Sequence, residues 1–275
     1  MLLRMVFFWM IGAYNNTVAL YLENIGGIVY FRIEDMKIEE DIDLNNQLKE
    51  GVANINEDSF NGRGYQEESV FYIPIVGQGY FFEIDVLKQK GKVREISDNK
   101  IYRLKTVEKE ISTNEFLFTT IDNKRIIWSM EEGIKDVLEM PLSNVRGIYA
   151  ATFQMDQKRY YIPLYERCIF GEIRGKIEKL NFDYPASIVF EEHVWEQYRA
   201  IFKYKGNIFF QTRVDGEFYC LDVDDDRIQR IEFDCSREDL VSIMEKIYKV
   251  RGYPSIMNEK REYSLCDFIN YVVGK

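Results

Sequence analysis

The stretch Tyr198-Arg199-Ala200-Ile201-Phe202-Lys203-Tyr204-Lys205-Gly206-Asn207-Ile208-Phe209-Phe210-Gln211-Thr212-Arg213 decides the fold. Residues 198–204 and 208–213 are rich in aromatic and β-branched side chains, which favour strands, and the polar residues 205–207 between them predict a turn. Asp215-Gly216 marks a second hairpin, followed by an apolar run at 218–223 and, after three aspartates at 224–226, another at 227–233. The segment 198–233 therefore predicts four antiparallel strands joined by short turns.

The same pattern returns upstream in a less regular form. Its aromatic runs lie about 43 to 49 residues apart after a first interval of 64, and align on Phe8, Tyr72, Phe118, Tyr161 and Phe210. This period, with several strands per repeat, predicts an all-β fold, a β-propeller of about five to six four-stranded antiparallel blades. In this alignment the first copy lacks its first strand, which would come from the C-terminal segment or from residues upstream of Met1.

The pattern also predicts the domain organisation. Residues 1–235 form the propeller, and the polar, acidic segment 36–62 is an insertion or long loop between blades. Residues 236–275 are predicted to be short C-terminal helices packed on the propeller. They carry apolar residues at helical spacing, namely Leu240, Ile243, Met244, Ile247 and Tyr248, then Leu265, Phe268, Ile269 and Val272.

Charge and composition exclude several classes of function. The formal net charge is −10, which disfavours nucleic acid and anionic membrane surfaces as partners. The four cysteines have irregular spacing without a CxxC motif, as expected for free thiols in the cytoplasm. The alternative is an exported protein, if residues 1–13, which hold one arginine and an apolar run, act as a signal peptide.

Signatures of catalysis and of metal or cofactor binding are weak. His193 is the single histidine, and it lies among acidic residues without a nucleophile motif, so we predict no catalytic residue. The acidic run 222–226 does not match the spacing of a calcium loop and predicts a charged hairpin turn, with no metal. Phosphate-binding glycine loops are absent from the sequence, and no cofactor is predicted.

Glycoside hydrolysis is the sharper enzymatic alternative, because it would use carboxylates that face one another across the propeller axis. The predicted innermost strands, however, hold acidic residues only at their borders, at Glu108 and Glu196. The segment 183–199 connects two blades and carries the candidate ligand-binding residues Tyr184, Trp195, Tyr198 and Arg199. These side chains would stack on a sugar or anchor a protein, or else they would fill a core between blades.

The repeat at 208–223, with Ile208-Phe209-Phe210-Gln211-Thr212 and Gly216-Glu217-Phe218-Tyr219-Cys220-Leu221-Asp222-Val223, resembles the degenerate propeller repeats of uncharacterised bacterial proteins. The resemblance covers about 65–235 and includes neither WD dipeptides nor kelch double glycines. It implies a binding or scaffold propeller that recognises a protein or glycan ligand through loops on one face. The alternative remains a glycan-active enzyme with axial carboxylates. The sequence does not indicate an oligomeric state.

Overall fold

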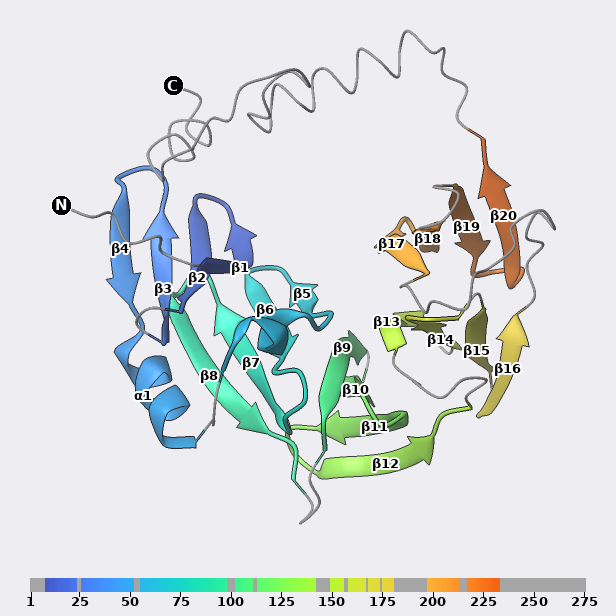
Figure 1. Cartoon of the computed structure of the whole chain (residues 1–275), viewed down its shortest axis with the longest axis horizontal. Helices are drawn as coiled ribbons and strands as arrows, with labels where there is room; N and C mark the ends of the chain where they lie inside the picture. Colours follow the sequence, from blue (N-terminus) through green and yellow to red (C-terminus); the bar gives the residue numbers. More distant parts are fainter. Residues whose placement is uncertain are drawn as a thin grey trace, which may run out of the picture. The chain divides into compact units, whose positions relative to one another are not determined.

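The computed structural model describes residues 8–23, 26–51, 55–97, 102–110, 113–141, 149–155, 158–166, 168–173, 175–180, 197–212 and 217–232, and the structural statements below concern these residues. They form twenty strands in five four-stranded antiparallel sheets, the blades of a β-propeller (Figure 1). The chain divides into two compact units, residues 1–230 and residues 231–275. The C-terminal helices predicted at 236–275 lie outside the described residues.

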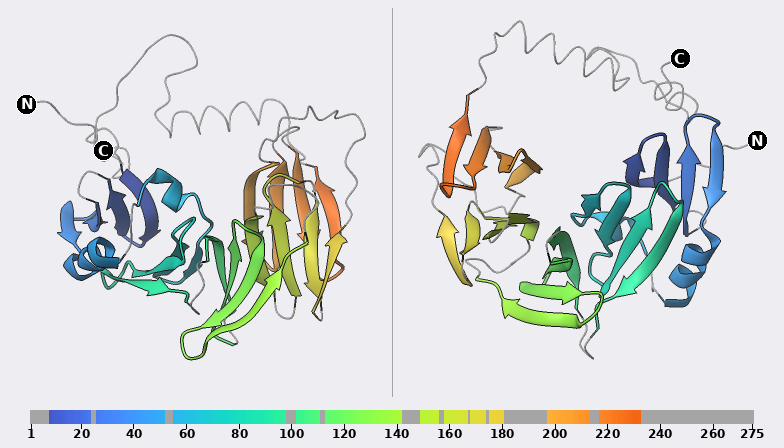
Figure 2. Two further views of the ribbon diagram at one scale, coloured as in Figure 1. Left: turned by 60° about the horizontal axis from the view of Figure 1, so that its bottom comes forward. Right: turned by 180° about the vertical axis from the view of Figure 1, so that it is seen from behind.

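Each blade is a meander in which consecutive strands are neighbours, shown in sequence colours in Figure 2. Blade 1 holds β1 (Phe8–Tyr14), β2 (Thr17–Leu22), β3 (Gly27–Arg32) and β4 (Lys37–Glu40). Blade 2 holds β5 (Tyr65–Glu67), β6 (Val70–Pro74), β7 (Tyr80–Asp85) and β8 (Lys90–Glu95). Blade 3 holds β9 (Leu104–Glu110), β10 (Glu115–Thr120), β11 (Lys124–Ser129) and β12 (Gly133–Glu139). Blade 4 holds β13 (Tyr149–Met155), β14 (Lys158–Pro163), β15 (Ile169–Ile173) and β16 (Lys176–Leu180). Blade 5 holds β17 (Tyr198–Tyr204), β18 (Asn207–Thr212), β19 (Phe218–Asp222) and β20 (Arg227–Ile231).

The turns follow the local chemistry of the sequence. Between β17 and β18, Lys205 and Gly206 both have positive φ, 47° and 80°. Two consecutive left-handed residues make a tight hairpin turn whose twist matches that of the flanking strands. The four strands predicted for 198–233 are therefore confirmed in blade 5.

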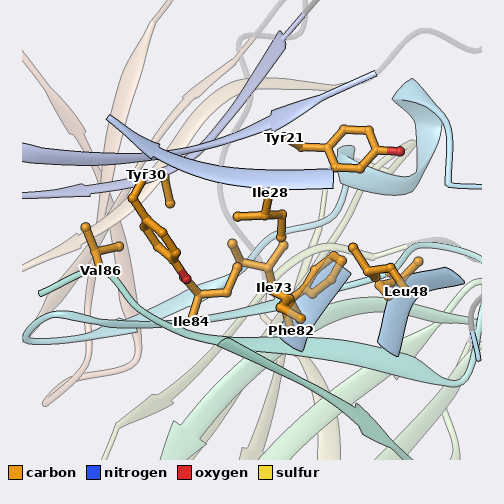
Figure 3. Close-up of a cluster of buried hydrophobic side chains, with 11 residues drawn as sticks. Tyr21, Ile28, Tyr30, Leu48, Ile73, Phe82, Ile84 and Val86 are labelled. Carbon is orange, nitrogen blue, oxygen red and sulfur yellow. The ribbon is translucent and has the colours of Figure 1, made fainter. Parts of the chain in front are cut away.

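Four apolar clusters join consecutive blades. In β18, Ile208 and Phe210 are fully buried while Phe209 between them is partly exposed, the alternation of a strand with one face in a core. The buried side chains meet partners from blade 4, such as Phe153 and Ile162. Equivalent clusters lie between blades 1 and 2, blades 2 and 3, and blades 3 and 4. Figure 3 shows the cluster between blades 1 and 2, to which Tyr21, Ile28, Tyr30, Leu48, Ile73, Phe82, Ile84 and Val86 contribute.

The first blade corrects one prediction. It is not missing a strand, because the aromatic run at Phe8 belongs to β1, the first strand of its blade. In the other copies the aligned residues lie in second strands, for example Tyr72 in β6 and Phe210 in β18. The second strand of blade 1, β2, is mainly aliphatic, so an alignment on aromatic residues shifted this copy by one strand.

The segment 36–62, predicted to be an insertion or long loop between blades, holds regular secondary structure. It contains β4, the helix α1 (Ile42–Gly51) and a 3₁₀ helix, η1 (Glu57–Phe60). Buried Leu44 and Leu48 join α1 to the cluster between blades 1 and 2. The helix was not predicted because α1 is mostly polar and buries only one narrow apolar stripe. No helix within the described ranges is long and apolar enough to cross a membrane.

Two buried polar side chains attach α1 to both blades. The Asn45 side chain accepts from the backbone N–H of Ile28 at 2.7 Å and donates to the Ile28 carbonyl at 3.2 Å. Asp41, just before α1, accepts from the N–H of Leu44 at 3.1 Å and from the N–H of Gly91 in β8 at 2.7 Å. The helix is thus bonded to β3 of blade 1 and, through Asp41, to β8 of blade 2.

Replacing Asn45 by alanine should destabilise this junction. Asn45 is 2% exposed, so Asn45→Ala leaves two backbone groups of Ile28 without their side-chain partner in a dry environment. The expected loss is about 1–3 kcal/mol in the free energy of unfolding, measured by urea denaturation. Asn46→Ala, at an exposed position of the same helix, is the matched control and should change stability by less than about 0.5 kcal/mol. Equal effects of the two substitutions would contradict this role of Asn45.

Candidate functional site

Polar groups from four blades, three side chains and the backbone of Gln154, lie around one buried carboxylate, that of Glu108. We call the four residues Arg63, Glu108, Gln154 and Lys203 the Glu108 cluster. Glu108 lies in β9 of blade 3, Gln154 in β13 of blade 4 and Lys203 in β17 of blade 5. Arg63 precedes β5 of blade 2 and bridges in parallel to Thr106 of β9. The first strands of several blades therefore place these residues together.

The contacts of the cluster are specific. The Glu108 side chain is 5% exposed; its carboxylate accepts from the backbone N–H of Gln154 and lies 4.0 Å from the Lys203 ammonium. Lys203 also donates to the Gln154 carbonyl at 3.1 Å. On the other side, Arg63 Nη1 donates to the Ile201 carbonyl at 2.7 Å. Its guanidinium stacks over the Phe153 ring, 4.3 Å from the centroid, a favourable cation–π contact.

Burial dominates the electrostatics of the cluster. It raises the pKa of Glu108 to about 7, although Lys203, Arg63 and the Gln154 N–H each act to lower that pKa. Burial likewise lowers the pKa of Arg63, and the charge of Glu108 opposes the change. The pKa of Tyr65 in β5 rises to about 12, first through burial and then through Glu108. The carboxyl group of Glu108 therefore changes charge near neutral pH.

Other carboxylates of the first strands also face cations. Glu67 in β5 accepts from Lys109 at 2.5 Å, and the Lys109 ammonium lies 5.3 Å from the centre of the Tyr72 ring. Glu110 at the end of β9 lies 3.8 Å from Arg159. Each carboxylate of β5 and β9 is thus close to a cation, an arrangement that balances charge between neighbouring blades.

A second ionic network joins blades 3 and 4. Arg125 of β11 and Glu172 of β15 are both almost fully buried, with Arg125 Nη1 3.5 Å from the Glu172 carboxylate. Arg125 also pairs with Asp136, and the Tyr161 hydroxyl donates to Glu172. Arg159 reaches the same carboxylate at 3.5 Å. Because Arg125 and Glu172 at its centre are buried and bonded to neighbouring side chains, we interpret this network as structural.

The predicted ligand-binding residues have different outcomes. Tyr198 is buried at 4% exposure, its hydroxyl donates to the Cys168 carbonyl at 3.3 Å, and its ring meets Phe210 edge-on. This placement fits the alternative interpretation, a residue that fills the core between blades. Arg199 lies in β17. Tyr184, Trp195 and the Arg199 side chain lie outside the description, as does His193, so their ligand-binding role stays a prediction.

The Glu108 cluster itself was missed by sequence reasoning. One signal was present, because the sequence places Glu108 at the border of a predicted innermost strand, directly after the apolar Val107. The cations that face it are 45 residues upstream and 95 residues downstream, and no local pattern connects them. The acidic run 222–226 is bonded to blade 4, where Lys158 donates to the Val223 carbonyl at 2.6 Å and to Asp226 at 2.9 Å. Among the described side chains, no group of three or more His, Cys, Asp or Glu is placed to hold a metal ion.

Comparisons with known proteins show the fold. No family model matches the chain, and no curated protein matches it. Among solved structures it is similar to a Bacteroides thetaiotaomicron protein of unknown function, with a TM-score of 0.53 and 12% identity over 84% of this chain and 59% of that one. PorZ, a surface component of the type-IX secretion system of Porphyromonas gingivalis, matches with a TM-score of 0.51 and 12% identity over 79% of this chain and 26% of PorZ.

A third similar structure is the extracellular domain of a putative one-component system from B. thetaiotaomicron, with a TM-score of 0.50 and 10% identity over 82% of this chain and 27% of that one. The chain spans between about a quarter and three fifths of the length of these solved chains. The fold and the comparisons together define the class of protein: a β-propeller of five four-stranded blades.

The Glu108 cluster predicts a specific dependence of stability on pH. Because the folded pKa of Glu108 lies above its unfolded value, its contribution to stability is fully present below about pH 4.5 and is lost as the pH rises through about 7. Glu108→Gln removes this titration. Relative to the natural protein, the variant should therefore gain roughly 2 kcal/mol of unfolding free energy between pH 5 and pH 8.

Urea denaturation at each pH measures this difference. Glu95→Gln, at an exposed glutamate in β8, serves as the matched control for the loss of one carboxyl group. If Glu108→Gln followed the natural protein in parallel across the range, the account of a buried, neutralised carboxyl would be wrong.

Proposed function

We propose that this chain is a non-catalytic binding propeller that recognises a protein or glycan ligand through loops on one face. The observation that carries the proposal is the pairing of Glu67, Glu108 and Glu110 in the first strands with Lys109, Lys203 and Arg159. Glycoside hydrolysis requires two carboxyl groups that face each other at roughly 5–10 Å across the scissile bond. Carboxylates that face cations support a scaffold whose recognition lies elsewhere.

The connection between blades 4 and 5 is the best candidate for that recognition. It spans residues 181–196 in the chain and carries Tyr184 and Trp195. Its C-terminal end is fixed, because the N–H of Gln197 donates to the Leu164 carbonyl, directly after β14, at 2.8 Å. Loops held at their ends by a rigid sheet are the usual place for ligand contacts. Aromatic side chains there would supply flat surfaces for a sugar ring or a protein anchor.

The similar solved structures indicate where a protein with such a binding role would be located. One is a surface component of a secretion system and another is an extracellular domain. These settings favour the exported alternative over a cytoplasmic location. Mass spectrometry of the mature N-terminus in the native host would show a cleaved leader if the protein is exported.

Binding should depend on Trp195. A glycan array and a pull-down from a cell-surface extract of the organism that makes the protein, both with the full chain, should identify a ligand. The affinity of the Trp195→Ala variant for that ligand should be lower by about tenfold or more. Trp195→Phe keeps an aromatic ring at the same place and is the matched control, expected to retain most of the binding. Equal binding by Trp195→Ala and the natural protein would remove this connection from the proposed site.

One observation favours the second candidate function, a glycan-active enzyme. A buried carboxyl group with a pKa of about 7 has the protonation state that a general acid needs at neutral pH. The enzyme hypothesis predicts release of reducing sugar from a panel of polysaccharides, with loss of at least a hundredfold in Glu108→Gln. Release that is unchanged in Glu108→Gln, or absent from the natural protein, would exclude Glu108 as the acid.

A further inference from the structure

The first strand of blade 5, β17, is held by polar contacts from three other blades. Arg63 of blade 2 donates to the Ile201 carbonyl at 2.7 Å, a contact between residues 138 positions apart in the chain. Lys203 donates to the Gln154 carbonyl of blade 4 at 3.1 Å and lies 4.0 Å from the Glu108 carboxylate of blade 3. The Glu108 cluster therefore attaches β17 to blades that are not its neighbours in sequence as well as to blade 4.

These contacts only partly satisfy groups that are withdrawn from water. Arg63 Nε is buried and has no hydrogen-bond partner among the described residues. The 4.0 Å between the Lys203 ammonium and the Glu108 carboxylate is longer than a hydrogen bond. Buried donors without partners and loosely paired charges weaken the closed arrangement. The cluster is therefore a place where β17 can separate locally from blades 2 and 3 while the apolar clusters stay intact.

The surroundings of Glu108 determine how a proton affects this separation. Within the described residues, it faces Arg63 and Tyr65 from blade 2, Lys203 from blade 5 and the backbone N–H of Gln154 from blade 4. The residue of β10 that pairs with Glu108 is an uncharged leucine. Both cations and the N–H favour the charged carboxylate, but burial outweighs them and raises the pKa of Glu108 to about 7.

We propose that the Glu108 cluster is a latch on β17 that closes when Glu108 takes up a proton and opens when it releases one. In the open state water reaches the carboxyl group, and its pKa returns towards the ordinary value of 4.5. Because the closed state has the higher pKa, the proton favours closure. The latch is most stable below about pH 4.5, and its stability falls as the pH rises from there through about 7.

The backbone N–H of Gln154 reports directly on the latch, because it donates to the Glu108 carboxylate. Its hydrogen exchange in the full chain, followed by nuclear magnetic resonance and corrected for the intrinsic effect of pH, measures how often the contact opens. Between pH 5 and pH 8 the protection of this amide should fall by roughly fiftyfold. Glu108→Gln keeps the shape of the side chain without its titration, so the protection should stay nearly constant in this variant.

A second variant tests the contact between blades 2 and 5. Arg63→Met removes the donor to the Ile201 carbonyl and should lower the protection of the Gln154 amide at pH 5 by about tenfold or more. Arg94→Met, at an arginine that pairs within blade 2, is the matched control and should leave this protection unchanged. If circular dichroism shows that Arg63→Met is unfolded, Lys203→Met replaces it with the same expectation, because the Lys203 side chain is 42% exposed.

Three results would overturn the proposal: equal protection of the Gln154 amide at pH 5 and pH 8 in the natural protein, the same fall in Glu108→Gln, or unchanged protection in Arg63→Met. The first result also separates the latch from the electrostatics of the cluster. If Glu108 titrated near pH 7 while the protection of Gln154 did not depend on pH, the carboxyl group would be buried as described, but its proton would not control β17.

Discussion

The rest of the structure depends on the packing of each sheet's apolar face against the next sheet. A sheet with an apolar face must bury that face against another element, and here each cluster takes side chains from two consecutive blades. The alternation seen in β18, with Ile208 and Phe210 buried and Phe209 on the opposite face, recurs in other strands that contribute to the clusters.

The polar groups between the first strands meet a second constraint. Strands from several blades approach closely there, so a charge is withdrawn from water and needs either a partner or a proton. Glu108 has partners, because two cations and a backbone N–H face it. Burial still raises its pKa to about 7, so it also holds a proton over part of the neutral pH range. Glu67 and Glu110, nearer the surface, are paired with Lys109 and Arg159. The arrangement supports a binding scaffold, and it also defines the one carboxyl group on which an enzymatic alternative depends.

The sequence was sufficient for the architecture because strand alternation and turn chemistry are local. The hairpins of blade 5 were predicted almost to the residue, and the fourfold pattern in blades 3 and 4 was correct. Local composition gave the wrong element in two places. The aromatic β1 was aligned with the second strands of the other blades, and the polar α1 was predicted as part of an insertion or loop. The Glu108 cluster could not be predicted, because Arg63 and Lys203 come from distant blades and only the folded chain brings them to Glu108.

The central claim is that four blades enclose the carboxyl group of Glu108, and titration of that group by nuclear magnetic resonance tests it most directly. With the side-chain carboxyl of Glu108 assigned by comparison with Glu108→Gln, its chemical shift is followed from pH 3 to pH 9 in the full chain. The account predicts a midpoint near pH 7. A midpoint near 4.3, the usual value for a solvated glutamate, would contradict it and would mean that the first strands do not meet around this residue.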